Sequence, residues 1–308
     1  MTKKIALTFA LCLTVCVSYA AAEFPLQKDG TTLVPKESRI GEATPVVWGE
    51  KPILIGSIHL SFDSLDPSVS KLCVVDYSSG LTISEFGVGL TLSCAYVEPR
   101  EDGDVLHVFA ARHPEGKNWF EPVEIVHLKT SDLETWTETP AIQADNEHLL
   151  NSSVCRDGDG YLMAYETDRP VQFCFKFARS TDLERWEKVP DVYYAGRDGA
   201  TYAACPVIRR CGEYYCVIYL RADGKGGYES AAIRSKDLRD WEESPLNPIL
   251  AASEGEGINN SDVDLFEYDG KTQLVYLTGD QQGSWDMRRA VFNGSEREFW
   301  ETIFKEKK

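Results

Sequence analysis

Short apolar runs separated by turn signals extend along most of the chain, and this pattern predicts β-strands. The runs are rich in valine, isoleucine, tyrosine and phenylalanine, as at residues 106–110, 214–219 and 274–277. Glycine-containing turn sequences, such as residues 157–160 and 269–271, separate such runs about every ten residues. No long stretch has the 3.6-residue apolar period of an amphipathic helix. The pattern therefore predicts an all-β protein.

A seven-residue phrase occurs three times, at residues 130–136, 180–186 and 235–241. The copies share a hydroxyl residue, then aspartate and leucine at the third and fourth positions, and a final tryptophan. The tryptophans are about 50 residues apart, a spacing typical of propellers and solenoids. The hydroxyl and carboxylate can bind backbone N–H groups and shape a turn, while leucine and tryptophan pack between neighbouring units. The alternative is that the tryptophans stack on sugars, but three copies on a ring cannot all face one ligand.

Alignment on the phrase defines a repeating unit with a polar opening segment, an inner strand, a second strand and a third strand that ends in the phrase. The opening segments are at residues 41–46, 92–97, 150–155, 201–206 and 259–264. Five such units fill the chain without a linker. The sequence therefore predicts one domain, residues 23–308, folded as a five-bladed β-propeller around a central channel.

The first 22 residues are predicted to be a secretory signal peptide. Lys3 and Lys4 precede an apolar run at residues 5–19, and small residues follow it. The alternatives are an N-terminal membrane helix and a lipoprotein signal, for which Val15 before Cys16 is too bulky. We therefore expect a secreted or periplasmic protein that is not attached to a membrane once the signal has been removed.

The charge of the chain restricts its partners. The formal net charge is −17, whereas nucleic acids and anionic membranes require a basic face on the protein. We therefore expect neither of them as a partner.

Cysteine and histidine usage indicates no metal site. Seven of the nine cysteines follow the signal segment, so at least one thiol is free or pairs between chains. Cys205, Cys211 and Cys216 are close enough in sequence for one bridge, although their spacing does not say which pair forms it. The five histidines are scattered and nothing has the spacing of metal ligands. We expect no metal and no other cofactor.

The repeated phrases, the turn at residues 156–162 and the Cys205-Pro206 pair before residues 212–215 resemble five-bladed β-propeller glycoside hydrolases. These are family 43 (arabinanases and xylosidases), family 32 (invertases) and family 68 (levansucrases), and the resemblance covers about residues 40–300. It implies acidic side chains that project from the inner strands into the channel. They are an aspartate in the first blade, an aspartate in a middle blade and a glutamate, the general acid, in a later blade.

The sequence departs from the family at these three positions. Glu42 is the acidic residue near the first, Asn151 stands at the second, and Ala204 stands where a glutamate precedes Cys-Pro. These replacements favour, as an alternative to an enzyme, a carbohydrate-binding propeller without catalytic activity.

Other carboxylates supply a candidate catalytic set: Glu42, Glu166, Asp262 and Asp264. Asp262 and Asp264 alternate with Val263, so on a strand they would share one face. Glu166 ends an apolar run, and the alternative for each is a solvated strand end. Glycoside hydrolysis needs a proton donor and a second carboxylate that activates water or attacks the sugar. We predict Glu166 or Glu42 as the acid and Asp264 as the base.

Predicted substrate-binding residues are aromatic or polar residues in loops or at strand ends around the channel. They are Trp119, Asn151, Tyr202, Arg221, Asp280, Gln281 and Trp285. Packing between blades is the alternative for each aromatic. The predicted function is an exported glycoside hydrolase that acts on a plant or algal oligo- or polysaccharide. A protein-binding propeller is a third alternative, disfavoured because no long apolar or charged stripe is evident.

Overall fold

The structure is a computed structural model that describes residues 25–61, 64–280 and 283–305. Nearly all its regular structure is β-strand, so the prediction of an all-β protein is confirmed. The predicted signal peptide lies outside the described residues. Within the described ranges, no helix is long and apolar enough to cross a membrane.

Three four-stranded antiparallel sheets follow one another along the chain, each with its strands paired in sequence order. The first contains β2 (Ile40–Trp48), β3 (Lys51–His59), β4 (Ser70–Asp76) and β5 (Thr82–Phe86). The second contains β6 (Leu90–Glu98), β7 (Val105–Arg112), β8 (Glu124–Thr130) and β9 (Thr137–Gln143). The third contains β10 (Leu149–Asp157), β11 (Gly160–Thr167), β12 (Cys174–Ser180) and β13 (Glu187–Tyr194).

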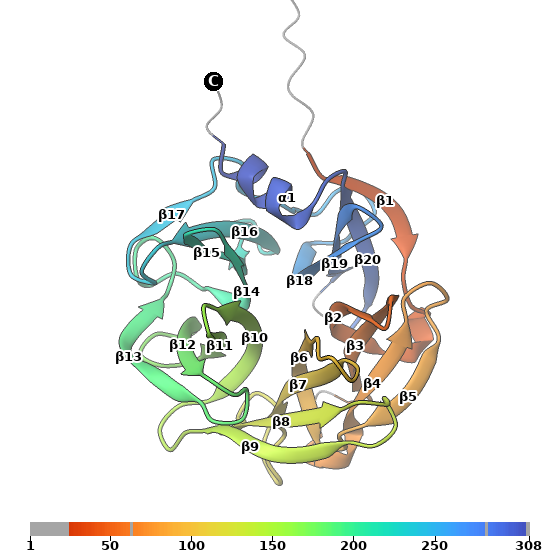
Figure 1. The fold of residues 1–308 in the computed structure, drawn as a ribbon. Coiled ribbons are helices and arrows are strands. Elements are labelled where there is room, and N and C mark those ends of the chain that lie inside the picture. Colours follow the sequence, from red (N-terminus) through yellow and green to blue (C-terminus); the bar gives the residue numbers. More distant parts are fainter. Residues whose placement is uncertain (1–24, 62–63, 281–282, 306–308) are drawn as a thin grey trace, which may run out of the picture.

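The remaining strands form an eight-stranded sheet made of two four-stranded parts. One part contains β14 (Ala204–Cys211), β15 (Tyr214–Ala222), β16 (Tyr228–Ser235) and β17 (Trp241–Glu243). The other contains β18 (Asn259–Tyr268), β19 (Lys271–Gly279), β20 (Trp285–Phe292) and β1 (Gln27–Thr32). Tyr228 and Asn259 form the parallel pair that joins them. In Figure 1 the sheets surround a central axis, with β2, β6, β10, β14 and β18 innermost, as in a β-propeller.

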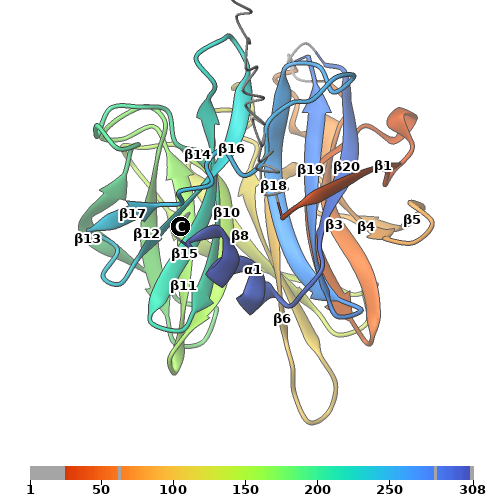
Figure 2. The same ribbon diagram turned by 90° about the horizontal axis from the view of Figure 1, so that it is seen from above.

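The core consists of apolar layers between neighbouring sheets. The layer between the two parts of the eight-stranded sheet is covered by α1 (Glu296–Ile303), whose Phe299 and Trp300 are buried in it. Figure 2 shows α1 lying across this junction. Two short 3-10 helices, Lys36–Ser38 and Pro67–Val69, lie in the loops after β1 and β3.

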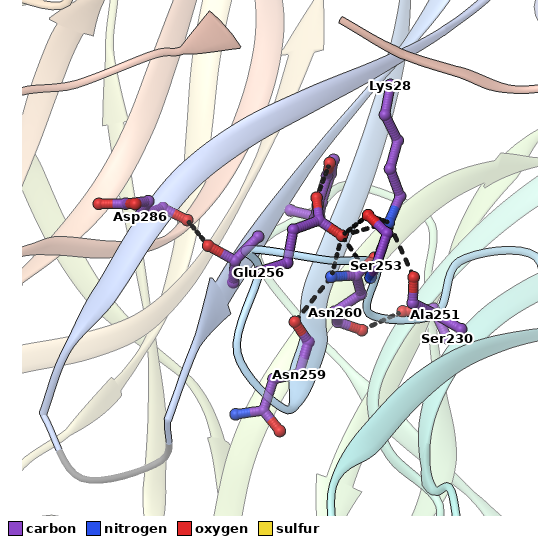
Figure 3. Close-up of polar contacts among 10 residues, drawn as sticks. Lys28, Ser230, Ala251, Ser253, Glu256, Asn259, Asn260 and Asp286 are labelled. Atoms are coloured by element: carbon purple, nitrogen blue, oxygen red, sulfur yellow. Dashed lines mark hydrogen bonds and ion pairs between the residues drawn. The ribbon is translucent and has the colours of Figure 1, made fainter. Parts of the chain in front are cut away.

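The N-terminal strand β1 closes the ring by pairing antiparallel with β20. From β1, the Lys28 ammonium donates to the Glu256 carboxylate and to Asn260 Oδ1 (Figure 3). Glu256 is buried and also accepts the Tyr276 hydroxyl at 2.8 Å. Burial raises the pKa of Glu256, but the hydrogen bonds from Lys28, Ser253 and Tyr276 lower it to about 2. This ion pair fixes the segment that leads into the inner strand β18.

The repeated phrase forms a tight turn that also joins neighbouring sheets. In the second copy, Ser180 Oγ accepts the Leu183 N–H at 2.9 Å, and the Asp182 carboxylate accepts the next two N–H groups of the turn. Leu183 has a φ of 64°, and Trp186 packs edge-on against Phe109 of the preceding sheet, with ring centroids 5.4 Å apart. The equivalent pairs are Trp136 with Phe86 and Trp241 with Phe177. These contacts confirm the structural interpretation of the phrase.

Each innermost strand contains an irregularity that turns side chains toward the axis. The pairing register shifts once in each of β2, β6, β10, β14 and β18. Glu42, Leu92, Cys205 and Asp262 have φ angles of 48°, 53°, 47° and 50° at these points. A bulge of this kind redirects a side chain, and a left-handed conformation costs a non-glycine residue about 1 kcal/mol or more. All four residues line one cavity at the end of the central channel, which is the candidate functional site.

Candidate active site

A cavity of about 500 Å³ lies at the end of the channel where the inner strands begin. Its polar lining includes Glu42, Asn151, Glu166, Cys205 and Asp262. Its aromatic lining comprises Trp119, Phe120, Phe173, Tyr202 and Trp285. The residues come from segments up to 243 positions apart in sequence, from Glu42 to Trp285. Apolar walls with a few convergent polar groups are typical of a small-molecule site.

Glu166 is the most deeply buried carboxyl group of this cavity, with 3% of its surface exposed. It lies near the end of β11, and its Oε2 accepts the Asn151 Nδ2 amide at 3.0 Å and the Cys205 backbone N–H at 2.8 Å. Burial, with smaller contributions from the charges of Asp262 and Glu42, raises its pKa to about 7. Glu166 therefore keeps its proton close to neutral pH, as a general acid must.

Asp262 takes its position in the cavity from the bulge in β18. Its Oδ1 accepts a hydrogen bond from the Cys205 thiol at 3.1 Å. Burial and then the charge of Glu42 raise its pKa to about 6. The pKa values of Asp262 and Glu166 are thus both raised, so each carboxyl group holds its proton to a higher pH than an exposed carboxyl group does.

Glu42 is the third carboxylate of the cavity. Its Oε2 lies 3.4 Å from His59 Nε2 and, among the described residues, accepts no hydrogen bond. His59 is buried, lies 3.4 Å from Thr91 Oγ1 and packs against Trp119 with ring centroids 5.3 Å apart. The sequence did not suggest His59, because it lies inside an apolar strand and no motif marks it.

Cys205 is a central residue of the site that the sequence pattern did not reveal. The resemblance assigned the channel position to Ala204, but the bulge in β14 buries Ala204 completely and turns Cys205 toward the cavity. The thiol also accepts the Asn151 amide at 3.3 Å. Burial, followed by the charges of Asp262 and Glu166, raises the pKa of Cys205 well above its usual value. It is therefore a neutral thiol and a poor nucleophile.

Asp264 has different surroundings from Asp262. Its carboxylate accepts the Arg209 guanidinium at 2.7 Å and the Leu265 N–H at 2.7 Å, and it does not line the cavity. The expectation that Asp262 and Asp264 share one regular face is wrong, because the register shift between Ser261 and Asp264 breaks the two-residue alternation.

The predicted binding residues fall into two groups. Trp119, Asn151, Tyr202 and Trp285 line the cavity. Arg221 and Asp280 do not: the Arg221 side chain pairs with Glu229 at 2.9 Å, and the Asp280 carboxylate accepts the Ser284 N–H at 3.2 Å. Gln281 lies outside the described residues.

All seven cysteines of the described chain are free thiols, so no bridge joins Cys205, Cys211 or Cys216. Among the described residues, no group of three or more histidine, cysteine, aspartate or glutamate side chains is arranged to hold a metal ion.

No protein-family model and no curated protein sequence matches this chain. Its fold is nevertheless shared with several solved structures. One glycoside hydrolase has a TM-score of 0.64 at 13% identity, over 88% of this chain and 92% of its own. The catalytic domain of the GH62 alpha-L-arabinofuranosidase of Coprinopsis cinerea has a TM-score of 0.64 at 12% identity, over 87% and 96% of the two chains. The GH43 protein BlXynB of Bacillus licheniformis has a TM-score of 0.58 at 16% identity, over 86% of this chain and 54% of its own. The chain therefore has the β-propeller fold of glycoside hydrolases of families 43 and 62, which confirms at the level of fold the resemblance seen in the sequence.

Proposed function

We propose that this protein is a glycoside hydrolase whose cavity binds one end or branch of a plant or algal oligo- or polysaccharide. The observation that carries the proposal is the convergence of Glu42, Glu166 and Asp262 on one aromatic-walled cavity, in which the pKa values of Glu166 and Asp262 are raised. Aromatic walls suit the apolar faces of sugar rings, and a carboxyl group of raised pKa beside a second carboxyl group suits acid and base roles.

We further infer that the propeller has five blades. The eight-stranded sheet divides into two four-stranded parts at the Tyr228–Asn259 pair. Five innermost strands carry a register shift, one in each four-stranded unit. These two observations support the same count as the sequence repeat.

In the proposed mechanism, Glu166 donates its proton to the leaving glycosidic oxygen. Its Oε2 is occupied by two donors, and its Oε1 has no hydrogen bond among the described residues, so Oε1 is available to the substrate. Asp262 is the proposed second carboxylate, which either activates water as a general base or attacks the sugar as a nucleophile. We assign Glu42 to sugar binding and to raising the pKa of its two acidic neighbours. The ion pair with Arg209 favours a structural role for Asp264 over the predicted role of base.

The test is hydrolysis of a panel of aryl glycosides and polysaccharides that includes arabinosides and xylosides. We expect turnover of at least one substrate, with Glu166→Gln and Asp262→Asn each lowering kcat by about 10²–10⁴-fold. Glu187→Gln, at an exposed position on β13, is the matched control and should keep full activity. No turnover across the panel, or unchanged activity in Glu166→Gln, would rule out the proposal.

A carbohydrate-binding propeller without catalytic activity is the second candidate. It is favoured by Asn151 and Cys205, which occupy inner-strand positions and tie up Glu166 Oε2 in hydrogen bonds. Calorimetry distinguishes the two functions: saturable sugar binding without product release supports this second candidate.

We also propose that residues 1–22 direct export and are then removed, leaving residues 23–308. Expression of the full chain followed by N-terminal sequencing of the exported protein tests this proposal. An intact N terminus on the exported protein would contradict it.

A further inference from the structure

A second hollow, of about 850 Å³, lies outside the channel between the end of β9 and the strands β11–β13. We name it the outer groove and define it by Gln143, Asn146, Tyr165, Pro170, Pro190 and Tyr193. None of these residues lines the cavity described above. The groove therefore requires an explanation of its own.

A row of three side chains crosses the floor of the outer groove. Tyr165 on β11 lies opposite Lys176 on β12, which lies opposite Tyr193 on β13. Tyr193 is 42% exposed, an unusual value for a large aromatic side chain in this protein. An exposed ring at the edge of a concave surface is suited to stack on the apolar face of a ligand.

The Tyr165 hydroxyl points to a polar ligand. The Tyr165 side chain is 1% exposed and lines the groove, yet within the described part of the chain its hydroxyl makes no hydrogen bond. Burial, with a smaller contribution from the nearby Glu147 charge, raises its pKa, so the group stays a neutral donor. The hydroxyl can therefore donate to a ligand that enters the groove. A ligand hydroxyl in the groove would supply the partner.

The charges of the outer groove are balanced. Glu147 is held between Lys176 at 2.6 Å and Lys188 at 2.7 Å. The remaining charged residues of the lining are Asp145, Asp191 and Arg169, so the groove contains three acidic and three basic side chains. On a chain of net charge −17, such a neutral surface suits a neutral ligand better than a strongly charged one.

One segment separates the outer groove from the cavity. Between β11 and β12, Arg169 and Pro170 line the groove, whereas Phe173 lines the cavity. The Phe173 carbonyl accepts the Ala203 N–H at 3.0 Å, which anchors this shared wall to the segment before β14. The same segment thus contributes residues to both the cavity and the outer groove.

From these observations, we propose that the outer groove binds a neutral oligosaccharide segment of the same glycan whose end or branch enters the cavity. The proposal rests on the proposed function for the source of the ligand. Tyr193 and the two prolines contact the sugar rings, and Tyr165, Gln143 and Asn146 donate to their hydroxyl groups.

The experiment is affinity electrophoresis in native gels that contain arabinan, arabinoxylan, laminarin or, as an acidic comparison, polygalacturonate. All variants carry Glu166→Gln so that hydrolysis cannot alter the gel. We expect retardation by at least one neutral polysaccharide, and a dissociation constant about five- to tenfold higher when Tyr193→Ala is added. Tyr165→Phe, which removes only the hydroxyl, should raise it about two- to fivefold. Ile83→Ala, which shortens an exposed side chain on β5, is the matched control and should change nothing.

Several results would overturn the proposal: no retardation by any neutral polysaccharide, retardation by polygalacturonate alone, or unchanged binding in both tyrosine variants. Failure of this proposal and failure of the proposed function give different results. A wild-type protein that releases no sugar but loses glycan binding on Tyr193→Ala would refute the enzyme and support the groove. An active enzyme whose glycan binding is unaffected by Tyr193→Ala would support the enzyme and refute the groove.

Discussion

Replacing Glu166 with glutamine tests both the burial of this carboxyl group and its role. Glutamine has nearly the shape of a protonated glutamate but cannot ionise. In the wild-type protein the pKa of Glu166 is raised from 4.5 to about 7, and a shift of one pKa unit corresponds to about 1.4 kcal/mol. Ionising Glu166 in the folded protein therefore costs about 3 kcal/mol more than in the unfolded chain. Only 3% of Glu166 is exposed, so solvent screening does not reduce this figure much.

The direction in which stability changes with pH follows from the number of protons bound by the folded and unfolded states. The raised pKa of folded Glu166 contributes stability that is fully present below pH 4.5 and is lost as the pH rises through 7. Glutamine contributes no such dependence. The difference in unfolding free energy between Glu166→Gln and wild type should therefore shift by about 3 kcal/mol in favour of the variant between pH 4.5 and pH 8.

The measurement is urea unfolding of both proteins at several pH values, combined with the activity panel. If Glu166 is the general acid, activity falls by about 10²–10⁴-fold in the variant that is relatively more stable at pH 8. If Glu166 had only a structural role, the variant would not combine higher relative stability at pH 8 with a large loss of activity. Wild-type and variant stability curves that run parallel from pH 4.5 to pH 8 would refute the raised pKa and, with it, the assignment of the acid.

Three further predictions concern stability and are each checked by denaturant unfolding. Lys28→Met leaves the buried Glu256 carboxylate unpaired and should lower the free energy of unfolding at pH 7 by about 3 kcal/mol; a loss below about 1 kcal/mol would contradict the closing role of this ion pair. Burial and the neighbouring histidine of its stacked pair lower the pKa of His127 to about 4, so from pH 6.5 to pH 4 the wild type should lose up to about 3 kcal/mol of stability relative to His127→Gln. Trp186→Ala removes the edge-on contact with Phe109 and should cost about 2 kcal/mol, whereas an unchanged midpoint would mean that the repeated phrase does not hold neighbouring sheets together.

The architecture could be predicted from the sequence because its signals are local and repeated. The seven-residue phrase encodes its own turn through Asp182 and its equivalents, and its tryptophan reaches only the adjacent sheet. The apolar runs that predict the strands recur in the same order in every repeating unit. Each of these features can be recognised without knowing which strands meet across the channel.

The candidate site was predicted only in part, because its geometry depends on bulges and on distant contacts. A bulge shifts the side-chain alternation by one residue, and nothing in the sequence marks Cys205 or Asp262 as a residue with positive φ, since neither is glycine. The family resemblance places Ala204 at the channel position, whereas the bulge turns Cys205 toward the cavity. Asp264 was misleading for a different reason: its partner, Arg209, is 55 positions away on another strand.

Glu166 and His127 act in opposite directions on the pH dependence of stability. Between about pH 4.5 and 6.5, Glu166 loses stability with rising pH, while His127 gains it, each by about 1.4 kcal/mol per pH unit. Asp262, whose pKa is raised to about 6, acts in the same direction as Glu166, and His107, whose pKa is lowered by burial, acts in the same direction as His127. The effect of each residue is therefore read as a difference from the wild-type curve. Relative to the wild-type curve, Glu166→Gln should tilt stability upward with rising pH, and His127→Gln should tilt it downward. The residues are on different sheets, so the two changes relative to wild type should add and largely cancel in the double variant, whereas tilts of the same sign would show that at least one of the two groups is not buried as described.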